Sequence, residues 1–222
     1  MPPHWLTLLS VLALIGALIS ALAIGFDLWR HPQTMKVMNA VWPVTALYFG
    51  PFAVWAYWSM GRQTGGGHMH RQMHKPFWMM TFTGTTHCGA GCTLGDIIAE
   101  FFVFLTGLTI AGSAFGAELV GDYILAFLLG IAFQYFAIVP MRHLSPGQVV
   151  LAALKADALS LTSFEVGLFI WMALMRFVFF HPALHPDSPV FWFMMQIGMV
   201  GGFATSFPVN WWLLKTGIKE RM

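Results

Sequence analysis

Two cysteines and two acids recur at four-residue intervals within an otherwise apolar stretch of this chain. Cys88, Cys92, Asp96 and Glu100 would lie on one face of a helix, because residues four apart lie one turn above one another. Paired thiolates bind soft or borderline ions such as Cu(I) and Zn(II), whereas carboxylates favour harder ions. His87 directly precedes the first cysteine and adds an imidazole. These residues predict a site for a transition-metal ion, with copper preferred to zinc.

A second group of possible metal ligands lies in the polar segment 61–76. His68, His70 and His74 are interspersed there with two methionines, and imidazole and thioether groups are both ligands for copper. The segment contains three consecutive glycines, which favours a loop. A polar loop that is rich in histidine for no chemical reason stays open as the alternative.

Acidic side chains also occur in a later apolar segment, at Asp157 and Glu165. A charged carboxylate at the centre of a membrane helix costs about 3 kcal/mol, so an acid within a span is usually functional. We expect Asp96 and Asp157 to lie at similar depth, and their two helices to face each other across a polar interior. Ser160 and Asn210 would complete a path along which a cation exchanges with protons.

Two other interpretations of the same stretch stay open. Cys88 and Cys92 could form a thiol pair in a membrane oxidoreductase or in an accessory subunit of a redox complex. The polar stripe could instead bind a partner helix in a structural membrane subunit, because Gly91, Gly95 and Ala99 beside it allow close helix approach. We favour a transporter or metal-binding protein over an enzyme.

The composition places these residues in a membrane protein. Apolar residues make up 58 % and charged residues 9 % of the 222 positions, whereas soluble proteins carry about 25 % charged residues. Apolar runs that are long enough to cross a bilayer predict an all-α polytopic bundle of about six spans. The predicted spans are approximately 5–26, 41–60, 86–112, 119–139, 148–180 and 189–214.

The distribution of Lys and Arg predicts an orientation, since basic residues concentrate on the cytoplasmic side of a membrane. With six spans, the side that holds both termini carries most of the basic loop residues, against Arg30 and Lys36 on the other side. We therefore expect both termini in the cytoplasm and a multi-pass protein of the inner (cytoplasmic) membrane. The expected partners are the lipid bilayer, a metal ion, and a second copy of the chain or a larger membrane complex, but no nucleic acid.

The stretch 86–96 resembles the signature of an uncharacterised bacterial membrane family, catalogued as domain of unknown function 4396. The signature has the form His-Cys-x3-Cys-x3-Asp, and it runs here from His87 to Asp96. The stretch 155–160, with Glu165 downstream, is similar to that family's second acidic helix, although Ala158 stands where members often have Thr. The stretch 208–213 resembles the family's closing helix.

The resemblance covers about residue 77 to the C-terminus and implies a multi-pass helical fold without an established activity. We accordingly expect three parts in the chain. They are two membrane helices in 1–60, a cytoplasmic His- and Met-rich loop in 61–76, and a four-helix membrane domain in 77–222 that carries the Cys and acidic residues.

Overall fold

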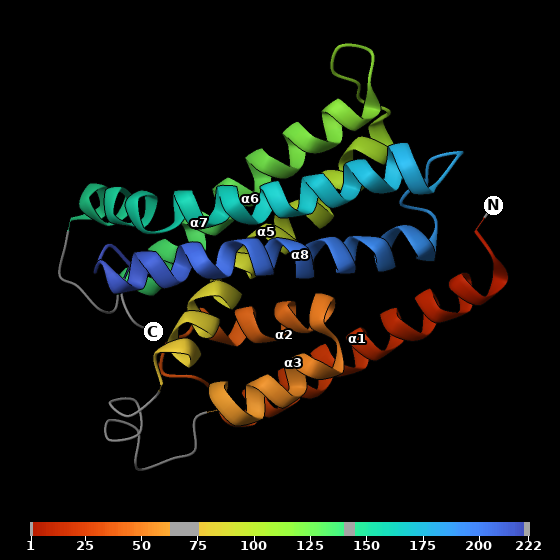
Figure 1. Ribbon diagram of the computed structural model, residues 1–222. Helices are drawn as coiled ribbons and strands as arrows, with labels where there is room; N and C mark the ends of the chain where they lie inside the picture. Colours follow the sequence, from red (N-terminus) through yellow and green to blue (C-terminus); the bar gives the residue numbers. More distant parts are fainter. Residues whose placement is uncertain (1, 63–75, 140–144, 220–222) are drawn as a thin grey trace.

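Five long helices form the body of the protein in a computed structural model, which describes residues 2–62, 76–139 and 145–219. Each is long and apolar enough to cross a bilayer. Helices account for most of the described residues, which contain no β-strand, so the predicted all-α bundle is confirmed. The five are α1 (His4–Arg30), α5 (Phe77–Thr106), α6 (Ala114–Ile138), α7 (Pro146–Leu174, continued by η2, Met175–Phe179) and α8 (Pro189–Lys215) (Figure 1).

Local signals explain where several of these helices begin and end. Ser145 and Gln148 form a capping box at the start of α7, and the Ser113 and Ser188 hydroxyls accept backbone N–H groups at the starts of α6 and α8. Gly107 ends α5 in the left-handed conformation, with a φ of 64°. These caps satisfy backbone groups that would otherwise lack partners in an apolar environment.

Helix α5 begins at Phe77 rather than near 86, where the sequence placed the start of the third span. The threonine-rich stretch between these positions is helical and buried. The hydroxyls of Thr81 and Thr85 donate to carbonyl oxygens one turn earlier, at 3.0 and 2.8 Å. Such bonds satisfy the hydroxyls within the helix itself, so these polar residues are compatible with a buried helix.

The predicted second span, 41–60, is wrong as a single crossing. The structure forms a helical hairpin instead, with α2 (Met38–Phe49) and α3 (Pro51–Ala56), the latter continued by η1 (Tyr57–Gly61). Gly50 separates the two arms with φ 56° and ψ −134°, a conformation that residues with a side chain rarely adopt. The apolar run therefore turns back at its midpoint.

Contacts between the two arms confirm that the hairpin returns to the end of the bundle where it starts. The rings of Trp42 and Tyr57 lie 5.6 Å apart, edge to face. Gln33, which precedes the first arm, donates from Nε2 to the carbonyl oxygen of Gly61 at 3.0 Å. A straight helix would separate Trp42 and Tyr57 by about 22 Å at 1.5 Å per residue.

The end of the hairpin is fastened to α1 by an ion pair. Arg62 donates from Nε and Nη2 to the two carboxylate oxygens of Asp27, at 2.9 and 3.0 Å. The Tyr57 hydroxyl donates to the same carboxylate at 2.7 Å. The hydrogen bonds that Arg62 itself makes to Asp27 raise the pKa of its guanidinium above the ordinary value, so this group stays charged.

The tip of the hairpin packs against α8 inside the bundle. Pro51 has no N–H, so the Leu47 carbonyl cannot form its helical bond to that residue. Gln196 of α8 supplies the missing donor, with 2.6 Å between its Nε2 and the Leu47 oxygen. Phe49 packs nearby on Phe203, with 5.0 Å between ring centroids. The hairpin thus enters the bundle without crossing it.

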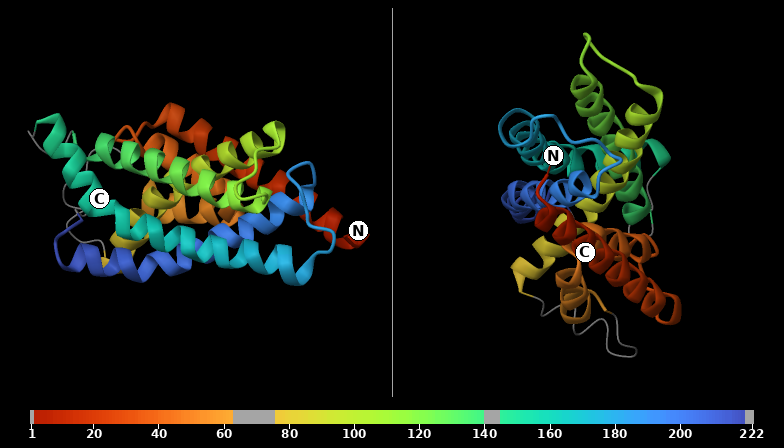
Figure 2. Two further views of the ribbon diagram at one scale, coloured as in Figure 1. Left: turned by 90° about the horizontal axis from the view of Figure 1, so that it is seen from above. Right: turned by 90° about the vertical axis from the view of Figure 1, so that its right-hand side faces the viewer.

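The hairpin changes the expected arrangement of the termini. The described residues contain five candidate crossings rather than six, and the two ends of the chain lie at opposite ends of the bundle (Figures 1 and 2). Pro2 lies near the loop between α7 and α8, whereas Lys219 contacts the first turns of α5. The prediction that both termini share one side is therefore corrected.

Helices α5 and α6 approach closely along a face of small residues, as the sequence predicted. A side-chain carbon built on Gly91 would lie 2.6 Å from the Gly130 Cα, and one built on Gly95 would collide with the backbone of Ala126. Small residues at these positions let the two backbones meet. The face that could have bound a partner helix is thus already covered within this chain.

Candidate functional site

Helix α5 carries five of the predicted site residues into the interior of the bundle. His87, Cys88, Cys92, Asp96 and Glu100 follow one another along it, and none is more than 1 % exposed. Both cysteines are free thiols. A run of polar side chains that is buried to this degree in an apolar bundle must be explained by its partners on neighbouring helices.

The first of these partners lie on α7. The Ser160 hydroxyl lies 3.6 Å from the Cys88 sulfur and 2.9 Å from Oδ1 of Asp157, to which it donates. The expectation that the third and fifth predicted spans face each other is therefore confirmed. The expectation that Asp157 lies level with Asp96 is wrong, because Asp157 lies beside the first turns of α5. Glu165, two turns further along α7, is the acid that comes near Asp96.

A buried lysine completes the environment of Asp157. The Lys219 ammonium lies 2.7 Å from Oδ1 of Asp157, and both side chains are fully buried. It also donates to Oδ1 of Asn210 at 2.8 Å and to the Gly84 carbonyl oxygen at 3.3 Å. Sequence reasoning did not identify Lys219, because a basic residue close to the C-terminus is expected to be exposed to solvent.

Asn210 is held in place by α8 and α7. Its Nδ2 donates to the Ser206 hydroxyl at 2.9 Å, and that hydroxyl donates to the Ser160 carbonyl oxygen at 2.8 Å. The amide is thereby oriented with its oxygen toward Lys219. Ser160 and Asn210, which were predicted to lie on an ion path with Asp157, thus belong to one hydrogen-bond network with it.

A group of four carboxyl side chains, which we call the acid cluster, fills the middle of the bundle. Its members are Asp96, Glu100, Asp122 and Glu165, from α5, α6 and α7, with at most 2 % exposure each. Asp96 lies within electrostatic range of the other three. Each member has at least one carboxyl oxygen without a hydrogen-bond partner among the described residues. Such groups are neutral when protonated, or else they require a cation.

Asp122 was missed by the sequence reasoning, although the signal was present. It lies within the fourth apolar run, and an acid within a span is the same feature that singled out Asp96 and Asp157. The Cys92 thiol lies beside the Glu165 carboxyl, which connects the acid cluster to the cysteines.

His87 lies between the acid cluster and the buried lysine, without a hydrogen-bond partner. Both ring nitrogens are buried and unpartnered among the described residues. The ring lies 6.2 Å from that of Phe133, centroid to centroid. It is within electrostatic range of Asp157 and Lys219. His87 is therefore a further buried polar group on the part of α5 that lies near Asp157 and Lys219.

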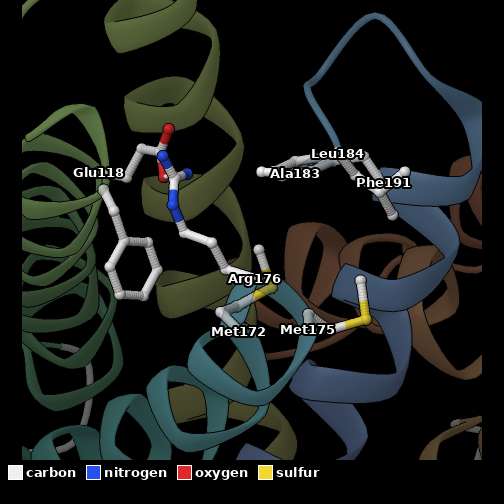
Figure 3. A pocket seen from close by; sticks show the side chains of 8 residues that line it. Glu118, Met172, Met175, Arg176, Ala183, Leu184 and Phe191 are labelled. Carbon is white, nitrogen blue, oxygen red and sulfur yellow. Dashed lines mark hydrogen bonds and ion pairs between the residues drawn. The ribbon is translucent and has the colours of Figure 1, made fainter. Parts of the chain in front are cut away.

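Another ion pair lies at the opposite end of the bundle from Lys219. Arg176 points toward Glu118 (Figure 3), with 3.4 Å between Nη1 and Oε2. Its guanidinium also lies over the Phe115 ring, 5.2 Å from the ring centroid. They line a small pocket of about 20 Å³ together with Met172 and Leu184. This is room for about one water molecule, so polar groups reach this end of the bundle as well.

The described residues contain no ready-made metal centre. No group of three or more His, Cys, Asp or Glu side chains lies close enough together in residues 2–62, 76–139 and 145–219 to hold an ion. His68, His70 and His74 lie outside the described residues. Structural metal sites have about four protein ligands, so the predicted Cys and acidic ligands do not form a closed site in this conformation.

The helices and their buried polar groups define a polytopic α-helical protein that is compatible with a membrane. Residues 77–219 match the model of a family described as "Domain of unknown function (DUF4396)", and the chain belongs to this family. The match covers α5 to α8, which supply the acid cluster, the cysteines and Lys219; α1 and the hairpin lie outside it. The chain matches no curated protein and no solved structure.

Proposed function

We propose that this protein moves a cation across a membrane in exchange for protons, with a transition-metal ion as its cargo and copper preferred to zinc. The observation that carries the proposal is the acid cluster, in which buried carboxyl oxygens lack partners among the described residues. Carboxyl groups in an apolar bundle are costly, and they typically mark ion pathways and proton relays.

Proton exchange follows from the charge balance of such a cluster. Unpaired acids in an apolar interior hold protons, because the neutral form is cheaper there than the charged form. An arriving cation stabilises the carboxylates and releases their protons. One proton leaves for each positive charge bound, so the interior stays close to neutral throughout the exchange.

The cysteines support a soft ion as the cargo. Cys88 and Cys92 lie one turn apart on α5, and Cys92 adjoins Glu165 of the acid cluster. Thiolate selects Cu(I) and Zn(II) over hard ions. Since no three-donor group exists among the described residues, the ion would pass between smaller sets of ligands. Such incomplete ligand sets favour transport over storage.

We infer an orientation from the basic residues. Six of the seven described Lys and Arg residues lie at the end of the bundle that holds Lys219, and Arg176 lies at the other end. Positive charge accumulates on the cytoplasmic side, so we assign the Lys219 end to the cytoplasm and the protein to the inner membrane. The six are Arg30, Lys36, Arg62, Lys155, Lys215 and Lys219.

The test is transport into liposomes that contain purified protein and a pH-sensitive dye. Cu(I) or Zn(II) should enter while protons leave. Replacement of all four cluster acids by amides should reduce both fluxes to the level of protein-free liposomes. The exposed acid Asp187 lies outside the cluster, so Asp187→Asn is the matched control and should transport normally.

Two results would contradict the proposal. One is metal uptake by the four-amide variant at the rate of the unaltered protein, and the other is uptake without proton movement. The double substitution Cys88→Ser and Cys92→Ser tests the cargo. It should reduce copper flux more than zinc flux, because serine lacks the soft sulfur ligand that Cu(I) prefers.

A further inference from the structure

The last described segment of the chain folds back into the bundle. After α8, Gly217 turns the backbone with a φ of 73°. The N–H groups of Ile218 and Lys219 both donate to the Leu213 carbonyl oxygen, at 3.1 and 3.2 Å. This turn directs the Lys219 side chain inward, where it is 1 % exposed.

Three oxygen atoms from three helices surround the Lys219 ammonium. They are Oδ1 of Asp157 on α7, Oδ1 of Asn210 on α8 and the carbonyl oxygen of Gly84 on α5, at 2.7, 2.8 and 3.3 Å. We call this group the oxygen site. A carboxylate, an amide and a backbone carbonyl converging on one positive charge are also the ligands that metal cations bind in proteins.

Polar groups continue inward from the oxygen site. Oδ2 of Asp157 is buried and has no hydrogen-bond partner among the described residues. On the inner side, Ser160 connects Oδ1 of Asp157 to the Cys88 sulfur. His87, with two unpartnered nitrogens, is nearby. Lys219 therefore lies at the outer end of a series of buried polar groups, several of them without hydrogen-bond partners among the described residues. This series leads toward Cys92 and Glu165.

We propose that the oxygen site is the first cation-binding site of the route at this end of the bundle, and that Lys219 is a tethered cation that fills it and closes the route. The inference rests on the proposed function and adds its regulation. A cation that arrives at this end must displace the ammonium, and the displaced tail uncovers Cys88. When the cation has moved inward, Lys219 can return and restore the ion pair with Asp157.

The closing contact can be tested through the reactivity of Cys88. In a Cys92→Ser background, Cys88 is the one remaining thiol. A cationic methanethiosulfonate reagent forms a mixed disulfide with it and releases methanesulfinate, which mass spectrometry follows on the purified full-length protein. Lys219→Met keeps the apolar stem and removes the charge. Lys219→Arg keeps the charge. Lys215→Met alters an exposed lysine one turn earlier and is the matched control.

We expect Cys88 to be nearly unreactive in the parent, in Lys219→Arg and in Lys215→Met. Lys219→Met should increase the labelling rate about tenfold or more, because a broken buried ion pair makes local opening much easier. In that variant the cationic reagent should react faster than an anionic reagent of similar size, since the vacated site presents oxygen ligands to it.

Three outcomes would overturn the inference. They are slow labelling in Lys219→Met, equal acceleration in Lys215→Met, and no preference for the cationic reagent. In a Cys88→Ser background, the labelling rate of Cys92 is measured instead. If Lys219→Met accelerates the labelling of Cys92 as much as that of Cys88, the substitution unfolds the protein generally, and this result would also contradict a local closure. Labelling requires no transported ion, so this result is independent of whether the liposome experiment succeeds.

Discussion

Asp157 and Glu165 lie two turns apart on α7 and differ in what surrounds their carboxyl groups. Asp157 is matched by the buried ammonium of Lys219 at 2.7 Å. Both oxygens of Glu165 lack a hydrogen-bond partner among the described residues. The Lys219 ammonium thus occupies the first carboxyl group, whereas no such cation occupies the second. The proposals made above accordingly assign the two acids different roles, closure to Asp157 and cation exchange to Glu165.

The buried ion pair can be tested through stability. Asp157→Leu and Lys219→Met should each lower the free energy of unfolding by about 3–5 kcal/mol, because each leaves one buried charge without its partner. The double variant should lose much less unfolding free energy than the sum of the two single losses, since neither charge remains. Thermal unfolding in detergent measures the stability of the parent, the two single variants and the double variant. Additive losses would show that the two side chains do not interact.

Sequence reasoning found both cysteines and four of the five buried acids on α5 to α7, but it missed Asp122 and Lys219. Cys88, Asp96 and Glu165 stand out because polar residues are expensive in apolar helices. Lys219 could not be found in this way, because its burial depends on a turn after α8 that brings it back to α7. Long-range pairing of this kind is a property of tertiary structure and has no local signal in the sequence.

At the scale of the elements, two glycines have different roles. Gly50 has open space around it but a φ of 56°, so the reversal between α2 and α3 depends on its backbone. Gly95 has ordinary helical geometry but lies against the backbone of α6. The first role is conformational, and the second is steric.

The contact between α5 and α6 predicts a clear difference between two glycine-to-alanine substitutions. Gly95→Ala should destabilise the protein by about 1–3 kcal/mol, because the new methyl group collides with the Ala126 backbone. Gly25 of α1 has nothing within 4 Å of its added carbon. Gly25→Ala should therefore stabilise the protein by about 0.5–1 kcal/mol through helix propensity. Thermal unfolding of both variants measures the difference, and equal effects would argue against the close approach.

Local features of the sequence predict most of the helix boundaries, and the run 41–60 is the exception. The lengths of the apolar runs predict the ends of α1 and α6 to α8 to within about five residues. The run 41–60 is as long and as apolar as a membrane span, so hydropathy alone predicts a single crossing there. Gly50 and Pro51 adjoin in its middle, but such residues also occur in kinked membrane helices. The ion pair of Arg62 with Asp27 holds the returning arm against α1, and a contact between such distant residues has no signal in hydropathy.

At the scale of the whole molecule, the hairpin leaves five candidate crossings, an odd number, among the described residues. The two ends of the chain consequently lie at opposite ends of the bundle (Figure 2). Six of the seven described basic residues then gather at one end, which is a stronger charge asymmetry than six spans would give. Under the orientation proposed above, this basic end of the bundle faces the cytoplasm.

Epitope tags on the two termini test this orientation. With the outer membrane made permeable, an N-terminal tag should be accessible to antibody while the inner membrane is intact, whereas a C-terminal tag should require its disruption. An internal tag between α5 and α6, after Gly107, should behave like the N-terminal tag. Two termini that are both protected would instead support a sixth crossing.

The placement of the chain ends has a consequence for how such a protein could be duplicated. A second copy that is joined directly to the C-terminus would begin at the end of the bundle opposite to the one where the first copy begins. Its helices would then run antiparallel to those of the first copy within the same bilayer. A tandem fusion of this fold would therefore generate an inverted repeat, and two parallel copies in one chain would need an additional helix between them.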